Sequence, residues 1–350
     1  MKTVRIDTPS RSYPVHIADN MLDRAGELAA EHVGICKAAI ITDNIVDGLY
    51  ADKLENSLRK SGFDTVKFVI PSGEKSKNAE NFLLILNFLA ENGLSRPDAV
   101  FALGGGVVGD IAGFAACVYL RGIKLVQIPT TLLAMIDSSV GGKTAIDLSS
   151  GKNLAGAFYQ PNIVICDCSA LETLDYEQRA NGFAEIIKYA VICDKELFEG
   201  LKVPKSLDIS DIILRCVEIK RDIVTADERD TGRRQILNFG HTLGHAIEKL
   251  SGFTLAHGKA VSIGMAIITK ACENAGICEN SCYNELVQML NRYSLPSKTS
   301  HTQESLFNAA ISDKKRKGEK ITLVLPEKIG RCFLKTMSLS EMREIIKLGI

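Results

Sequence analysis

Three of the chain's six histidines lie in one short stretch, LNFGHTLGHAIEKLSGFTLAHGKA. His241 and His245 are spaced so that they share one face of a helix, and His257 follows a glycine-containing turn that can fold it back onto them. Zinc prefers imidazoles together with a carboxylate, and a catalytic site leaves a position open. The carboxylate candidate is Glu185, in the apolar segment GFAEIIKYAVI. The pattern predicts a divalent-metal site in a helical region.

Each of these residues also has a purely structural explanation. One such histidine can be a hydrogen-bonded core residue, and Glu185 can form an ion pair with Lys188 one helical turn later. A carboxylate in apolar surroundings needs a cationic partner in either case. The stretch lacks the H-E-x-x-H motif of the zinc peptidases. Taken together, the residues favour a metal site.

A second candidate site is the segment FALGGGVVGDIAGF. Gly104, Gly106 and Gly109 match G-x-G-x-x-G between an expected strand and an expected helix, where backbone N–H groups can bind a pyrophosphate. The next strand, LVQIPT, does not end in an acidic residue, so a ribose carboxylate would have to come from Asp43 or Glu74. The motif therefore predicts either a variant dinucleotide site or a turn that only packs the helix on the strand.

Residues 129–153 read PTTLLAMIDSSVGGKTAIDLSSGKN, and we expect them to form a loop. Gly-Lys-Thr resembles the end of a P-loop, but Asp137 stands where that motif needs its first glycine. Lys143, Lys152 and Asn153 can bind an anion, and a solvated surface loop is the alternative.

More cations lie near the histidine cluster. Arg233 and Arg234 shortly precede His241, and Lys220 and Arg221 lie on an expected helix before them. A substrate that carries both a carboxylate and a phosphate would suit this supply of cations. The charge run DKKRK at 313–317 is instead typical of a solvated face.

The elements that must position these residues fall into two halves. β-Branched runs alternate with amphipathic segments in the first half, which predicts a parallel sheet with ligand sites at the carboxyl ends of its strands. From about residue 178 the pattern is helical, apart from one strand-like run at 320–325. We predict a Rossmann-like α/β domain over 1–175 and an all-α domain over 176–350. The expected strands are 38–42, 65–70, 99–103, 125–128 and 163–166.

Composition excludes several classes of protein. The 350 residues include 42 basic and 42 acidic side chains, so a net charge of zero argues against nucleic-acid or membrane-surface binding. The ten cysteines contain no C-x-x-C pair, which favours a reducing compartment. The N-terminal residues lack the apolar region of a signal peptide, and the apolar stretch 99–120 carries Asp110 and several glycines. We expect a soluble, cytoplasmic protein.

In order and spacing, several segments resemble the 3-dehydroquinate synthase family of sugar phosphate cyclases. They are GGGVVGDIAGFAACVYLRGI, IPTTLLAMIDSSVGGKTAIDLSSGKNLAGAFYQP, GFAEIIKYAVI, and LNFGHTLGHAIE with AHGKAV. The resemblance covers at least residues 43–318. It implies an NAD-binding α/β domain, a helical zinc-binding domain, an active site in the cleft between them, and a homodimer.

The resemblance also implies roles for individual residues. It makes Glu185, His241 and His257 the metal ligands and moves His245 to the substrate phosphate. Further phosphate contacts would be Lys143, Asn153, Asn238, and Lys314 or else Lys315. Arg121 would be supplied to the active site by the partner subunit. Lys220 and Arg234 would clamp the substrate carboxylate, and Asp137 and Lys188 would contact its hydroxyls.

For NAD, the resemblance implies contacts along the first half of the chain. One departure is Ile45, where the family often has asparagine near the adenosine ribose; Met135 and Asp147 also differ from the commonest residues. The implied NAD positions are Asp43, Ser72, Gly73, Glu74, Lys75, Ser76, Lys77, Gly106, Val107, Val108, Gly109, Asp110, Thr130, Thr131, Lys143, Lys152, Ala170, Leu171, Glu172 and Thr173.

The implied activity is that of a carbon–oxygen lyase of the shikimate pathway, on the route to chorismate and the aromatic amino acids. It would convert 3-deoxy-D-arabino-heptulosonate 7-phosphate to 3-dehydroquinate and phosphate by transient oxidation with NAD, β-elimination, reduction and aldol closure. The divalent metal, zinc or else cobalt, would act at the C4 and C5 hydroxyls.

Three other functions fit parts of the pattern. Another sugar phosphate cyclase, forming 2-deoxy-scyllo-inosose or an epi-valiolone, would have no use for Lys220 and Arg234 as a carboxylate clamp. A metal-dependent alcohol dehydrogenase of the glycerol dehydrogenase kind shares the two-domain plan. A non-catalytic NAD-binding relative would need losses among the metal ligands, and Glu185, His241 and His257 are all present.

Overall fold

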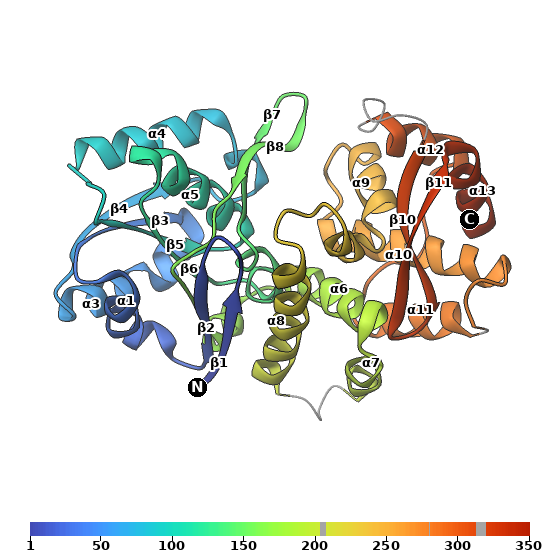
Figure 1. The fold of residues 1–350 in the computed structure, drawn as a ribbon, viewed down its shortest axis with the longest axis horizontal. Coiled ribbons are helices and arrows are strands. Elements are labelled where there is room, and N and C mark those ends of the chain that lie inside the picture. The colour runs from blue at the N-terminus through green and yellow to red at the C-terminus, as the bar shows by residue number, and fades with distance from the viewer. Residues whose placement is uncertain (204–207, 280, 313–319) are drawn as a thin grey trace. The chain divides into compact units, whose positions relative to one another are not determined.

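The computed structural model describes residues 1–203, 208–279, 281–312 and 320–350 (Figure 1). They form two units: Met1–Asp175 with Ile209–Arg229, and Tyr176–Asp208 with Asp230–Ile350. The sequence pattern assigns all of 176–350 to one domain, whereas in the structure Ile209–Arg229 belongs to the first unit. The reason is packing, because α8 (Ile209–Ala226) buries an apolar face and contacts the first strand of the chain.

A seven-stranded sheet organises the first unit, in the order β1-β2-β9-β6-β5-β3-β4. β1 pairs antiparallel with β2, and every other neighbouring pair is parallel. The five expected strands are all present, and β1 and β2 extend the sheet beyond them. The strands are β1 (Lys2–Asp7), β2 (Ser12–Ala18), β3 (Lys37–Asp43), β4 (Asp64–Ile70), β5 (Ala99–Gly104), β6 (Lys124–Pro129) and β9 (Ile163–Asp167).

Helices cover both faces of this sheet (Figure 1). On β3, Ala38 and Ile40 pack into one apolar core with α1 and α3, while Ala39 and Ile41 pack into another with α4 and α5. Burial on both faces explains why the strands are continuous apolar runs. The helical segments of this unit are η1 (Met21–Arg24), α1 (Ala25–Val33), α2 (Asn44–Val46), η2 (Asp47–Ala51), α3 (Asp52–Lys60), η3 (Glu74–Ser76), α4 (Ala79–Glu91), α5 (Gly106–Val118), η4 (Tyr119–Arg121), η5 (Ala134–Ser138), η6 (Cys168–Thr173) and α8.

The expected loop at 129–153 is mostly regular structure. It contains η5 and then β7 (Lys143–Leu148), which pairs antiparallel with β8 (Gly151–Phe158). Thr144 and Ile146 on β7 are buried, and the strand contacts α5. The loop prediction was wrong because the density of Ser, Gly and Lys concealed this short alternation.

The second unit is helical, with one two-stranded hairpin. α10 is its central helix and contacts α6, α9, α11 and α13. The hairpin contains the expected strand at 320–325 and a second strand that we did not expect, so the unit is not purely α. Its elements are α6 (Tyr176–Cys193), α7 (Lys195–Leu201), η8 (Arg233–Asn238), α9 (His241–Leu250), α10 (His257–Asn274), α11 (Cys282–Arg292), α12 (Gln303–Ser312), β10 (Lys320–Lys328), β11 (Arg331–Ser338) and α13 (Leu339–Gly349).

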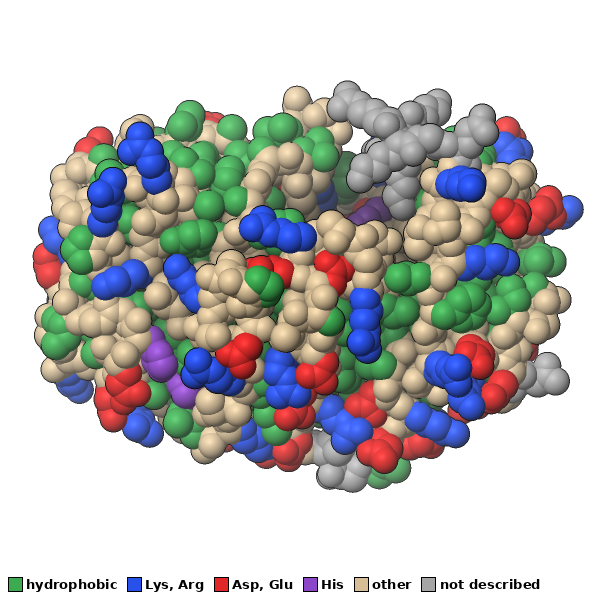
Figure 2. Space-filling view, in the orientation of Figure 1, with side chains coloured by type: hydrophobic (Ala, Val, Ile, Leu, Met, Phe, Trp, Pro, Cys, Tyr) green, Lys and Arg blue, Asp and Glu red, His purple; other side chains and the backbone are tan. Residues whose placement is uncertain are grey.

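Two further observations concern membrane and nucleic-acid binding. In the part of the chain that the structure describes, no helix is both long and apolar enough to cross a membrane. On the face drawn in Figure 2, acidic and basic side chains are interspersed, in keeping with the zero net charge.

Candidate active site

Two of the candidate metal ligands are the first residues of their helices. His241 opens α9 and His257 opens α10, while Glu185 lies in the buried part of α6. Gly240 has φ +77°, a conformation that favours glycine, and a side chain there would collide with Met265. A Cβ on Gly264 would lie 2.1 Å from the carbonyl oxygen of Gly240. Glycine at both positions lets α9 approach α10 closely enough to bring the two histidines together.

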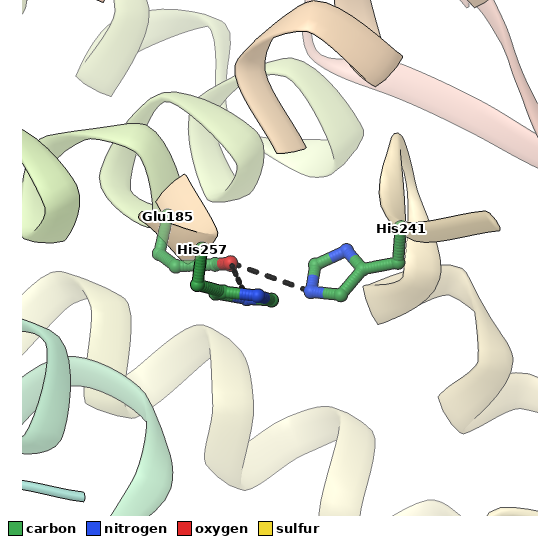
Figure 3. A group of neighbouring side chains, drawn as sticks. All are labelled: Glu185, His241 and His257. Atoms are coloured by element: carbon green, nitrogen blue, oxygen red, sulfur yellow. Dashed lines mark ion pairs between the residues drawn. The ribbon is translucent and has the colours of Figure 1, made fainter. Parts of the chain in front are cut away.

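The three side chains converge on a single point of the second unit (Figure 3). The Nε2 atoms of His241 and His257 each lie 3.3 Å from Oε1 of Glu185. The other ring nitrogen of His241, Nδ1, lies 3.1 Å from the backbone oxygen of Phe239. A carbonyl oxygen can only accept, so this contact favours a proton on Nδ1, and loss of the proton from Nε2 would free its lone pair for a cation. One carboxylate and two imidazoles are a donor set that zinc uses in catalytic sites.

Glu185 is ionised although it is completely buried. Burial by itself would raise the pKa of its carboxyl, but Lys188 and His241 outweigh burial and hold the pKa well below the ordinary range. The Lys188 Nζ lies 2.6 Å from Oε2, and the two side chains are 1% and 0% exposed. The ion pair with Lys188 and the metal site are therefore not alternatives, because they use different oxygens of one carboxylate. Oε2 faces Lys188 and Oε1 faces the two imidazole nitrogens, so Oε1 is the oxygen placed to bind a cation together with the histidines.

His245 is near this set without joining it. Its ring centroid lies 5.5 Å from that of His241 and 5.9 Å from that of His257, and its side chain is exposed. Helical spacing alone does not separate the three histidines, but among the described residues the donor atoms of His241 and His257, and not those of His245, form a group with Glu185. Asn238 is also exposed, whereas Arg234 is buried in η8.

The glycine turn of the first unit joins β5 to α5. A Cβ on Gly104 would meet Val108 at 2.7 Å, and one on Gly109 would meet Gln127 of β6 at 2.9 Å. Both glycines thus serve close packing of helix on strand, which is the part that the third glycine plays in dinucleotide folds. The hydroxyls of Thr42 and Thr130, at the carboxyl ends of β3 and β6, are buried and make no hydrogen bond within the described ranges. Unpartnered polar atoms at this edge of the sheet fit a polar ligand.

Next to this turn, Lys77 is enclosed by three carboxylates. Its Nζ lies 3.2 Å from Glu74, 3.2 Å from Asp110 and 3.9 Å from Asp147, and its side chain is 5% exposed. Burial would lower the pKa of Lys77, but the three acids outweigh burial and raise the pKa. Burial raises the pKa of Asp110 to about 6, although Lys77 opposes the change. Asp147, one of the noted departures, therefore belongs to the charge network of the predicted cofactor region.

The remaining predicted substrate residues are distributed along both units. Lys220 of α8 donates to the backbone oxygen of Asp137 at 2.6 Å and also to its carboxylate, so two predicted substrate residues are paired with each other. On the hairpin, Lys143 opposes Phe158, whereas the backbone of Asn153 donates to Asp147 near the turn. The structure therefore does not place Lys143 and Asn153 at the same level of the hairpin. Lys314 and Lys315 lie outside the described residues.

Known proteins match this chain over almost its whole length. Residues 67–181 match the family described as 3-dehydroquinate synthase N-terminal, and residues 182–316 match 3-dehydroquinate synthase C-terminal. The 3-dehydroquinate synthase of Caldanaerobacter subterraneus subsp. tengcongensis is 42% identical, and that of a Thermoanaerobacter species is 44% identical, each over 99% of this chain and 100% of its own length. The chain belongs to the 3-dehydroquinate synthase family. This confirms the predicted family and the predicted lyase activity.

The solved structures of two other synthases confirm the predicted fold class. A 2-deoxy-scyllo-inosose synthase complexed with carbaglucose-6-phosphate, NAD+ and Co2+ superposes with a TM-score of 0.88 at 23% identity, over 100% of both chains. The 2-epi-5-epi-valiolone synthase of Streptomyces hygroscopicus subsp. jinggangensis, with NAD+ and Zn2+ bound, gives 0.86 at 27% identity, over 97% of this chain and 96% of that one.

Proposed function

We propose that this member of the 3-dehydroquinate synthase family binds a divalent metal, zinc or cobalt, through Glu185, His241 and His257, and binds NAD at the carboxyl ends of β3, β5 and β6. The observation that carries the proposal is the convergence of one carboxylate oxygen and two Nε2 atoms on one point. The buried threonine hydroxyls and the glycine turn support the cofactor site. When bound, the two groups would supply Lewis acidity toward the substrate hydroxyls and reversible acceptance of a hydride.

Lys188 would prepare the metal site. It compensates the charge of the buried Glu185 carboxylate in the metal-free protein, so the carboxylate stays ionised and the unfilled site remains stable. The same ammonium group would also be a hydrogen-bond donor to a substrate hydroxyl beside the cation.

The other polar residues would bind and orient the substrate. We assign the carboxylate of the heptulosonate to Lys220 and Arg234, and a hydroxyl of its carbon chain to Asp137. Lys220 orients the Asp137 carboxylate through the contact described above. Lys143, Asn153, Asn238, His245 and one of Lys314 and Lys315 are assigned to the phosphate. Cations around a departing phosphate stabilise the charge that develops during elimination, and the phosphate itself can accept the proton.

We also propose a homodimer in which Arg121 enters the partner's phosphate site. Arg121 is exposed, and both it and Leu120 have positive φ angles, 67° and 50°. Two consecutive residues that are not glycine cost of order 1–3 kcal/mol each in this conformation, and such strain concentrates at functional sites. A dimer with Arg121→Ala in one subunit and a lesion of the metal site in the other should test whether the arginine acts across the interface.

The activity is tested by supplying the heptulosonate phosphate with zinc and catalytic NAD. Inorganic phosphate and 3-dehydroquinate should appear in equal amounts, without net formation of NADH. Net NADH from a polyol would instead indicate an alcohol dehydrogenase, and turnover of a phosphorylated sugar without a carboxylate would indicate a different cyclase.

A further inference from the structure

Glu248 is a buried carboxylate beside the metal ligands that the assigned roles leave unused. It lies near the end of α9 and is 4% exposed. Its Oε2 lies 3.3 Å from Nδ1 of His257. Its backbone oxygen accepts hydrogen bonds from Phe253 N at 2.8 Å and from the Ser251 hydroxyl at 2.7 Å. These bonds hold the end of α9 and the turn that leads to His257 in place.

The two histidine ligands therefore have different partners on the side away from Glu185. Nδ1 of His241 faces the neutral carbonyl of Phe239, whereas Nδ1 of His257 faces a charged carboxylate. A carboxylate at Nδ1 holds the proton there and leaves the Nε2 lone pair directed at the cation. Such a partner also strengthens electron donation by the ring, and its loss commonly weakens metal binding about 10- to 100-fold.

We propose that Glu248 is a positioning residue of the metal centre, which holds the ring of His257 in the orientation and tautomer that bind the metal. The inference rests on the metal site of the proposed function. Glu248 touches the ligand rather than the cation, so its contribution should be to metal affinity and ligand geometry.

The same residues suggest a competing role, which the test must separate. Donor atoms of His245, Glu248 and His257 also lie within 4.8 Å of one another, so Glu248 could itself bind a second cation. That arrangement would use Nδ1 of His257 for the second metal, whereas a positioning role needs a proton on Nδ1. The number of metal ions per chain therefore distinguishes the two roles.

The test measures metal binding by Glu248→Gln and Glu248→Ala in the full chain, without substrate. Zinc affinity is measured by competition with a chelator, metal content by elemental analysis, and ligand geometry by the visible spectrum of the Co2+ form. The matched control is Glu273→Gln on α10, whose carboxylate accepts a hydrogen bond from Tyr283 N at 2.9 Å. We expect every protein to bind one metal ion per chain. Zinc affinity should be about 10-fold lower in Glu248→Gln and up to about 100-fold lower in Glu248→Ala, and both variants should show an altered cobalt spectrum. Glu273→Gln should match the wild type.

Several outcomes would overturn the inference. If both variants bind zinc within twofold of the wild-type affinity, Glu248 does not position His257. If the wild type binds two metal ions and the variants bind one, Glu248 is instead a ligand of a second metal site. If Glu248→Ala fails to fold, Glu248→Gln still decides the question, because the amide keeps the shape and removes the charge. If the wild-type chain binds one zinc, its affinity falls when Glu248 is replaced, and it forms no dehydroquinate, the inference is supported and the proposed function is contradicted.

Discussion

Replacing Lys188 by Met should destabilise the metal-free protein strongly. The substitution keeps the length of the side chain but removes the charge that lies 2.6 Å from Glu185, in a pair that is 1% and 0% exposed. Removing one partner of a buried ion pair costs about 3–5 kcal/mol, because the remaining charge is left buried without compensation. The pKa of Glu185 should also rise, since its lowered value depends on Lys188 as well as on His241.

Zinc should reverse part of this loss. A cation at Oε1 of Glu185 would compensate the carboxylate that Lys188 no longer neutralises, so the loss of stability should fall by at least half when zinc is in excess. By linkage, the variant must then bind zinc more tightly than the wild type does. The assay is urea unfolding of both proteins in chelator and in excess zinc, followed by a direct zinc titration.

Lys259→Met is the matched control within the same unit. Lys259 pairs with Glu177 at 2.7 Å, but the two side chains are 25% and 73% exposed, and exposed pairs contribute about 0–1 kcal/mol. The reasoning would be refuted if both variants lost the same stability in chelator, or if zinc left the loss in Lys188→Met unchanged.

Three further predictions concern the separate sites. His257→Ala should abolish tight zinc binding and turnover while leaving the circular dichroism spectrum unchanged; stoichiometric zinc in this variant would contradict its assignment as a ligand. Arg234→Ala should raise the KM for the heptulosonate phosphate far more than the KM for NAD. The control is Arg233→Ala, which changes the exposed neighbouring arginine and should leave both KM values within about twofold of wild type. Equal increases in both KM values would argue against a carboxylate clamp. Burial holds the pKa of Asp110 at about 6, above the ordinary 3.8. Between these two values the folded state keeps a proton that the unfolded state has released. The stability that this proton contributes is therefore lost as the pH rises through 6. The stability of Asp110→Asn relative to wild type should therefore increase by about 2 kcal/mol between pH 4.5 and 7.5 in urea titrations, and a pH-independent difference would show that Asp110 does not titrate in this range.

Local patterns in the chain were enough to predict the parallel strands and to single out Glu185 and the three clustered histidines as candidate metal ligands. A strand buried on both faces must be a continuous apolar run, and β3, β5, β6 and β9 are such runs. A glutamate in an apolar helix and histidines beside glycines are also visible without coordinates, because residue type and spacing alone make them unusual. For the same reason the resemblance to the synthase family could be recognised from short segments.

Packing between distant segments decided the rest. α8 has an amphipathic pattern that would suit either unit, and its contacts with β1, β2 and η5 place it in the first. Asp147 joins the network of Lys77, and Glu248 reaches His257 across a turn, although neither spacing corresponds to a helical or strand period. Periodicity shows which face of its own helix or strand a residue occupies, whereas the residue that it contacts depends on how separate elements pack. The close approach of α9 to α10 at Gly264 is such a case, because it depends on both helices together.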